Sequence, residues 1–219
     1  MNIADNLQNI TTTLPKTVTL VAVSKTKPVS DLTVAYNAGQ RIFGENKIQE
    51  MADKWEEMPK DIQWHMIGHV QTNKVKYMAP FVSLIHGVDS FKLLKEIDKQ
   101  AEKNNRVIDC LLQFHIAEEE TKFGLDEKEG IELLTSNDFA ALKNVQILGV
   151  MGMATFTDNQ NQVKKEFTHL KSIFENLKAL NPAHSNFKTI SMGMSGDYPL
   201  AIECGSNMVR IGSSIFGGR

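Results

Sequence analysis

The hydrophobic positions of the chain fall into two kinds of segment that follow one another along most of its length. Short runs rich in apolar and β-branched residues predict strands, and these runs are continuous rather than alternating. The eight predicted strands cover residues 17–24, 40–44, 62–68, 81–87, 106–115, 145–153, 187–193 and 207–217. Continuous apolar runs are typical of parallel strands that are covered on both faces.

Stretches with apolar residues at helical spacing fill the gaps between these strands. The predicted helices cover residues 29–39, 45–58, 71–79, 90–105, 126–137, 162–180 and 196–205, and one more, 1–14, precedes the first strand. Strict alternation of strand and helix predicts a parallel sheet. Eight repeats in 219 residues favour an α/β fold of the (β/α)8 TIM-barrel type with an extra N-terminal helix, and an open doubly wound sheet is the alternative. No repeat or linker divides the chain, so we expect one domain over residues 1–219.

Composition and charge narrow the class of protein. The chain is 42% hydrophobic, which is enough for one sizeable core, and its net charge of -2 gives no bias toward nucleic acid or an anionic membrane. The N-terminus lacks the pattern of a signal peptide, and no apolar run approaches the length of a membrane span, so we expect a cytoplasmic protein. Cys110 and Cys204 stand alone in apolar surroundings and are expected to be buried free thiols.

Two segments near the C-terminus have the residues of an anion-binding site. "SMGMSGD" (191–197) and "RIGSS" (210–214) each place glycine and serine after a predicted strand. Glycine lets backbone N–H groups approach a phosphate, and serine hydroxyls donate further hydrogen bonds. Either glycine alone would be explained by a tight turn. Both segments, however, follow strands seven and eight, where phosphate sites of such barrels commonly form, so we predict a phosphate site there.

The first strand ends in an unusual way, in "TLVAVSKTKP" (19–28). The apolar run leads directly to Lys25, with Lys27 two residues later, at the end of the barrel where active sites lie. In a low-dielectric environment a lysine amine loses its proton more readily, and the neutral amine can form a Schiff base with a carbonyl. A solvated lysine in a polar loop is the alternative. Spacing alone does not separate the two lysines, although Lys25 lies closer to the strand.

Arg210 lies inside the apolar segment "MVRIG" (208–212), where a guanidinium needs a partner. It either pairs with a buried acid such as Glu45 or Glu203 or donates to a ring nitrogen or an anion of a ligand. A lysine, a phosphate site and a donor for a heterocycle together suggest pyridoxal 5'-phosphate (PLP). A Schiff-base aldolase shares the first two features, but there the phosphate belongs to the substrate.

The histidines predict no metal site. His65 and His69 are four residues apart, but they straddle a strand end rather than sharing one face of a helix. The other four histidines form no recognisable constellation in the sequence; they are His86, His115, His169 and His184.

Five motifs give the chain a resemblance to a known family: "AVSKTKP", "FGENKIQE", "WHMIGHVQTNK", "ETKFGL" and "SMGMSGDYPLAIECGSNMVRIGSSIFGGR". Over essentially its whole length the chain resembles the YggS/PROSC family, the pyridoxal phosphate homeostasis proteins. The resemblance implies the barrel that also forms the N-terminal part of alanine racemases. It also implies that PLP is held as a Schiff base by the lysine of "VSKTKP", which is Lys25.

The resemblance implies roles for further residues. The phosphate would be held by Ser191, Ser195, Gly212 and Ser213. Arg210 would face the pyridine nitrogen, Asn46 would lie near the ring, and Ile67 and Met192 would line the pocket. Two departures from the family pattern, Asn207 in place of a common threonine and the strand ending "GVMGMAT" (149–155), touch none of these positions.

The resemblance also bears on whether the protein is an enzyme. An arginine at the pyridine nitrogen keeps that nitrogen unprotonated, which makes the ring a poorer electron sink. Racemisation needs acid or base groups on both faces of the substrate carbon, and alanine racemases bring one from a second, all-β domain, whereas this sequence ends after the eighth strand. We therefore expect a monomeric, non-catalytic PLP-binding protein that buffers PLP or delivers it to apo-enzymes, with indirect effects on amino-acid and keto-acid pools. A weak PLP-dependent amino-acid racemase or another Schiff-base enzyme is the alternative.

Overall fold

The eight strands form a closed parallel barrel in sequence order, as a computed structural model of the chain shows. The structure describes residues 2–118, 123–180 and 186–218. The barrel closes between the first and last strands, where Leu20 pairs with Val209, and this pairing rules out the open-sheet alternative. The strands are β1 (Thr19–Val23), β2 (Ile42–Glu45), β3 (Gln63–Met66), β4 (Leu84–Val88), β5 (Ile108–Phe114), β6 (Val145–Gly152), β7 (Thr189–Met194) and β8 (Met208–Ile211).

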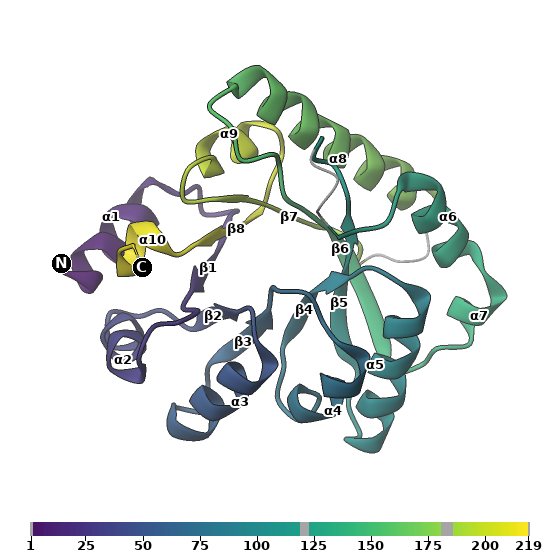
Figure 1. Cartoon of the computed structure of the whole chain (residues 1–219), viewed down its shortest axis with the longest axis horizontal. Helices are drawn as coiled ribbons and strands as arrows, with labels where there is room; N and C mark the ends of the chain where they lie inside the picture. The colour runs from purple at the N-terminus through teal and green to yellow at the C-terminus, as the bar shows by residue number, and fades with distance from the viewer. Residues whose placement is uncertain (1, 119–122, 181–185, 219) are drawn as a thin grey trace.

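Helices surround the strands, as Figure 1 shows, and the predicted TIM-like α/β architecture is confirmed. They are α1 (Ile3–Thr13), α2 (Val29–Asn37), α3 (Ile48–Glu57), the 3-10 turn η1 (Thr72–Lys74), α4 (Val75–Met78), α5 (Phe91–Lys103), α6 (Glu127–Thr135), α7 (Asn137–Ala140), α8 (Gln160–Leu180), α9 (Tyr198–Glu203) and α10 (Ser213–Phe216). Across the described residues, none of these helices is both long and apolar enough to cross a bilayer.

Three details differ from the sequence prediction. The predicted strand 207–217 is a four-residue strand that ends at Ile211, and the rest of it turns at Gly212 into α10. The segment 71–79 begins as a 3-10 turn rather than as an α-helix, and the short helix α7 was not predicted. Part of the motif 120–125 lies outside the described residues.

The core has two layers because successive side chains of a strand point to opposite faces. The inner layer lies within the barrel and is filled by Val21, Leu84, Leu111, Met151 and Met208, which come from five different strands. The outer layer is a much larger cluster between the strands and the surrounding helices. Both faces of every strand are therefore covered, which explains the continuous apolar runs in the sequence.

The two ends of the chain lie side by side, with α1 next to α10 in Figure 1. The side-chain amide of Asn6 on α1 donates to the carbonyl oxygen of Ile215 on α10 at 3.0 Å. Beyond α10, the carbonyl oxygen of Gly218 accepts a hydrogen bond from the Lys27 amine at 2.9 Å. The segment after β8 is thus held against the segment after β1.

The two cysteines are free thiols in different surroundings. Cys110 on β5 is fully buried, and burial raises the pKa of its thiol. Cys204, at the end of α9, is only partly buried, so the prediction of a buried thiol is wrong there because the short helix leaves its last turn near the surface.

Candidate functional site

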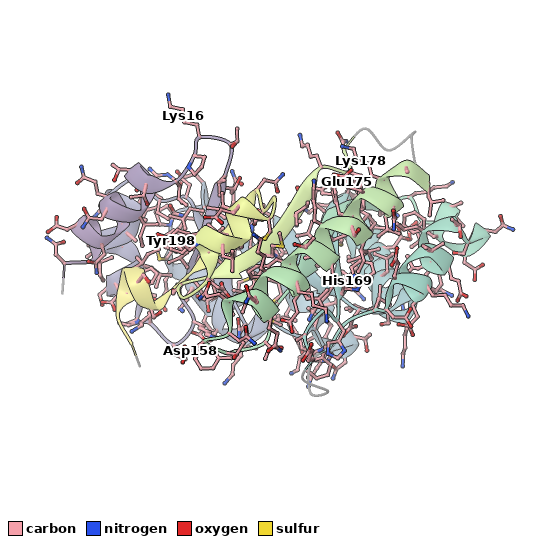
Figure 2. The ribbon with its side chains drawn as sticks, turned by 90° about the horizontal axis from the view of Figure 1, so that it is seen from above. Lys16, Asp158, His169, Glu175, Lys178 and Tyr198 are labelled. Carbon is pink, nitrogen blue, oxygen red and sulfur yellow. The ribbon has the colours of Figure 1, made fainter. Side chains whose placement is uncertain are left out.

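A cavity of about 660 Å³ opens at the carboxyl ends of the strands. Figure 2 shows Asp158, from the cavity-lining segment between β6 and α8, at one edge of the molecule. Lys16, which precedes β1, and Lys178, near the end of α8, lie at the opposite edge. The cavity is therefore at the end of the barrel that the sequence predicted. Seven of the nine predicted site residues line it: Lys25, Asn46, Ile67, Ser195, Arg210, Gly212 and Ser213.

The other two predicted residues, Ser191 and Met192, do not line the cavity, and both are fully buried. Because neighbouring residues of β7 point to opposite faces, Met192 packs into the outer core and Ser191 points into the barrel. Neither side chain reaches the cavity, so an indirect role is the one that fits their positions.

Lys25 and Lys27 both line the cavity, but their amines differ in what they contact. The Lys27 amine donates to the carbonyl oxygen of Gly218. Among the described residues, the Lys25 amine takes part in no hydrogen bond or ion pair, and its side chain is partly buried. Between the two lysines, Thr26 has a φ of 65°, in the left-handed region that β-branched residues rarely adopt. Of the two lysines, Lys25 is thus the one whose amine no interaction among the described residues engages.

The segments after β7 and β8 meet at Ser195. Its hydroxyl oxygen accepts hydrogen bonds from the backbone N–H groups of Gly212, at 3.3 Å, and Ser214, at a long 3.5 Å. A Cβ atom at Gly212 would lie 3.0 Å from the carbonyl oxygen of Val23, so a side chain there would press on β1. Two amides and a hydroxyl that converge in this way can hold the oxygens of a phosphate.

Arg210 brings a buried cation to the cavity from β8. Its guanidinium donates to the carbonyl oxygen of Ser191 at 2.9 Å, to the hydroxyl of Ser191 at 2.6 Å and to the carbonyl oxygen of Gly152 at 3.1 Å. Burial lowers the pKa of Arg210 to about 10, with Asp197 opposing the shift, so the guanidinium remains charged at neutral pH. In the described part of the chain, no ion pair joins Arg210 to Glu45 or Glu203. Its guanidinium N–H groups are bound instead by oxygen atoms of Ser191 on β7 and Gly152 on β6.

A chain of buried hydrogen bonds continues from Ser191 through two histidines. The Ser191 hydroxyl lies 3.0 Å from Nδ1 of His86, and Nε2 of His86 lies 3.0 Å from Nδ1 of His65. Since the Ser191 hydroxyl oxygen accepts from Arg210, we assign its O–H as the donor to His86 Nδ1. The Nε2–H group of His86 then donates to Nδ1 of His65. Burial lowers the pKa of His65 to about 3 and that of His86 well below 6.5, so both rings are neutral.

The histidine chain was missed in the sequence, where these residues gave no constellation. Its members are separated by 21 and 105 positions, so no local spacing connects them. One signal was present: His65, His86 and Ser191 are polar residues inside predicted buried strands, and buried polar groups require partners.

The two neutral histidines predict a loss of stability in mild acid. Both have folded-state pKa values below the unfolded value of 6.5, so the unfolded state takes up more protons as the pH falls below 6.5. At pH 5 we expect His65 to cost about 2 kcal/mol of unfolding free energy, and the lowered pKa of His86 acts in the same direction. Denaturant unfolding of the wild type at pH 7 and pH 5 measures the sum, and a His86→Gln variant should show a smaller change. Substituting the exposed His169 by Gln is the control, and an equal change in all three proteins would contradict the assignment.

Comparisons with known proteins identify the family of the chain. The family model of the alanine racemase N-terminal domain matches residues 1–219. The pyridoxal phosphate homeostasis protein of Haemophilus influenzae is 38% identical over 206 residues, which are 93% of this chain and 86% of that protein. The chain belongs to the pyridoxal phosphate homeostasis protein family. Its relative from Aquifex aeolicus is 40% identical over 202 residues, covering 91% of this chain and 86% of the relative.

A member of the pyridoxal phosphate homeostasis family with a solved structure, PipY of Synechococcus elongatus, has the same fold. PipY is 33% identical to this chain, and the match covers 98% of this chain and all of PipY. The TM-score is 0.92 for PipY without PLP and 0.89 for PipY with PLP bound. PLP is thus bound in a close structural homologue.

Proposed function

We propose that this protein binds PLP in the cytoplasm for PLP homeostasis, holds it as a Schiff base with Lys25, and buffers it or delivers it to apo-enzymes. One observation carries the proposal: Lys25, Arg210 and the Ser195 cradle, which is the Ser195 hydroxyl with the Gly212 amide, line the same cavity. These are the three groups that a phosphorylated pyridine aldehyde requires. No interaction among the described residues engages the Lys25 amine. We further propose that residues 1–219 act as one monomeric barrel domain.

The cavity suits PLP part by part. We assign the phosphate to Ser195, Gly212 and Ser213, whose hydroxyls and amides surround the start of α10. Arg210, Asn46 and Ile67 line the cavity, so Arg210 would face the pyridine nitrogen and the other two would lie near the ring. Ser191 acts by holding the Arg210 guanidinium, and Met192 supports β7 from the outer core. When bound, PLP supplies a reactive aldehyde, and the protein supplies the amine that holds it.

The charge of Arg210 favours storage over catalysis. A guanidinium is a donor only, so it keeps the pyridine nitrogen unprotonated and weakens the ring as an electron sink. Racemisation also requires a second acid or base on the far face of the substrate carbon. A ring that is a poor electron sink suits buffering and transfer better than catalysis.

A racemisation assay tests this function directly. We expect the PLP-loaded protein to convert L-alanine to D-alanine no faster than an equal concentration of free PLP, because the ring is a poor electron sink. Chiral chromatography measures the product, with the Lys25→Ala variant and PLP as the matched control. A rate about tenfold above free PLP, equivalent to roughly 1.4 kcal/mol of transition-state stabilisation, would favour the racemase alternative.

Delivery needs a separate measurement. The loaded protein, freed of unbound PLP by gel filtration, should restore the activity of an apo form of a PLP-dependent enzyme. If the enzyme stays inactive while the loaded protein keeps its PLP, the delivery part of the proposal is wrong.

A further inference from the structure

A buried ionic cluster lies directly behind the Lys25 segment and consists of Ser24, Glu45, Glu50 and Lys54. The side chain of Lys54, on α3, is only 7% exposed, and that of Glu45, at the end of β2, is fully buried. The Lys54 ammonium donates to Glu45 Oε1 at 2.8 Å, to Glu50 Oε1 at 2.7 Å and to the carbonyl oxygen of Ser24 at 2.8 Å. These three acceptors match the three N–H groups of an ammonium.

The cluster holds the peptide groups on both sides of Lys25. Lys54 binds the carbonyl oxygen of Ser24, which belongs to the peptide before Lys25. Glu50 Oε1 accepts from the backbone N–H of Thr26 at 2.6 Å, and this N–H belongs to the peptide after Lys25. The Lys54–Glu50 ion pair therefore fixes both peptide planes that meet at the Lys25 Cα. It also stabilises the left-handed φ of Thr26, which is otherwise unfavourable for a β-branched residue.

Because the charged groups of this cluster are buried, their desolvation offsets much of the stability that the ion pairs contribute. Burial raises the pKa of the Glu45 carboxyl, although hydrogen bonds from Lys54 and from the Ser24 hydroxyl, at 2.6 Å, oppose the shift. The second oxygen of Glu45, Oε2, is buried without a hydrogen-bond partner. Apolar side chains of similar volume often replace such ion pairs with no loss of stability. A role in geometry accounts for the cluster better than a role in stability.

We propose that Lys54 and Glu50 are positioning residues that hold the Lys25 backbone so that its amine points into the cavity, and so set the affinity for PLP. The proposal rests on the proposed function, in which Lys25 is the attachment residue. A preorganised segment binds more tightly because no free energy is spent on ordering it.

A Glu50→Ala variant tests the clamp, with Glu57→Ala, an exposed carboxylate on the same helix, as the matched control. Glu50 is partly exposed and can be removed without uncovering the core. In the ligand-free protein we expect hydrogen exchange at the Thr26 amide, followed by NMR, to accelerate about tenfold or more, because the carboxylate that accepts its hydrogen bond is lost. The apparent dissociation constant for PLP should rise about tenfold. Glu50→Gln keeps an acceptor oxygen, so its exchange rate and its dissociation constant should lie between those of the wild type and of Glu50→Ala.

A second variant separates positioning from stability. Lys54→Met alone would leave Glu45 buried and uncompensated, so we pair it with Glu45→Leu, which removes both charges. We expect this double variant to melt within a few degrees of the wild type but to bind PLP about tenfold more weakly. Unchanged PLP affinity in it and in Glu50→Ala, with unchanged exchange at Thr26, would overturn the clamp. If instead Lys25→Ala still forms the Schiff base, the proposed function fails, while the exchange result at Thr26 stands independently.

Discussion

Replacing Lys25 with alanine is expected to abolish the visible absorbance band that forms when the protein is mixed with PLP. The band belongs to a Schiff base, and within the described residues the Lys25 amine is the one in the cavity that no hydrogen bond or ion pair engages. The Ser195 cradle and Arg210 remain in the variant, so PLP should still bind without a covalent bond, and more weakly. Spectra of both proteins at equal PLP concentration measure the difference.

Lys27→Ala is the matched control for this experiment. Lys27 lines the same cavity, but its amine is occupied by the carbonyl oxygen of Gly218. We expect the band to survive in Lys27→Ala with little change in height. A band that persists in Lys25→Ala, or disappears in Lys27→Ala, would show that PLP is attached to a residue other than Lys25.

Replacing Gly149 with alanine is expected to be the most damaging single change to the barrel. Gly149 lies on β6 where its register with β5 shifts, and its φ is 151°. An added Cβ would lie 1.8 Å from the carbonyl oxygen of Thr189 on β7, so the two strands would have to separate. Strain and overpacking together should lower the unfolding free energy by about 3 to 5 kcal/mol.

Thermal unfolding tests this expectation, with a fall in Tm of about 6 to 20 °C for a chain of this size. Gly196→Ala is the control, since a Cβ there meets nothing within 4 Å and its φ is not in the left-handed region. Equal melting temperatures for the two variants would show that β6 and β7 can move apart at no cost.

The barrel was predictable because its signal is repeated eight times. Each strand has apolar residues on both faces and each gap has a helical period, so errors at single boundaries do not change the topology. The boundary of β8 was wrong because "SSIF" (213–216) has the composition of a strand, and only the turn at Gly212 makes it a helix. Helix α7 has four residues, too few to show a period.

The cavity lining was largely predictable because strand ends converge at one mouth in this fold. The buried networks were not, since their partners lie far apart in the sequence. Lys54 carried one overlooked signal: it is three residues from Met51 and six from Ile48, on the buried face of α3. A lysine at that position requires a buried partner, and Glu45 could have been considered for it.

Mapping the attachment site tests the central claim most directly. Borohydride reduces a Schiff base to a stable secondary amine, so the loaded protein can be reduced, digested and examined by mass spectrometry. The account predicts one modified peptide, with the pyridoxyl phosphate mass on Lys25 and none on Lys27. A modification on any other lysine, or no covalent adduct in a protein saturated with PLP, would contradict it.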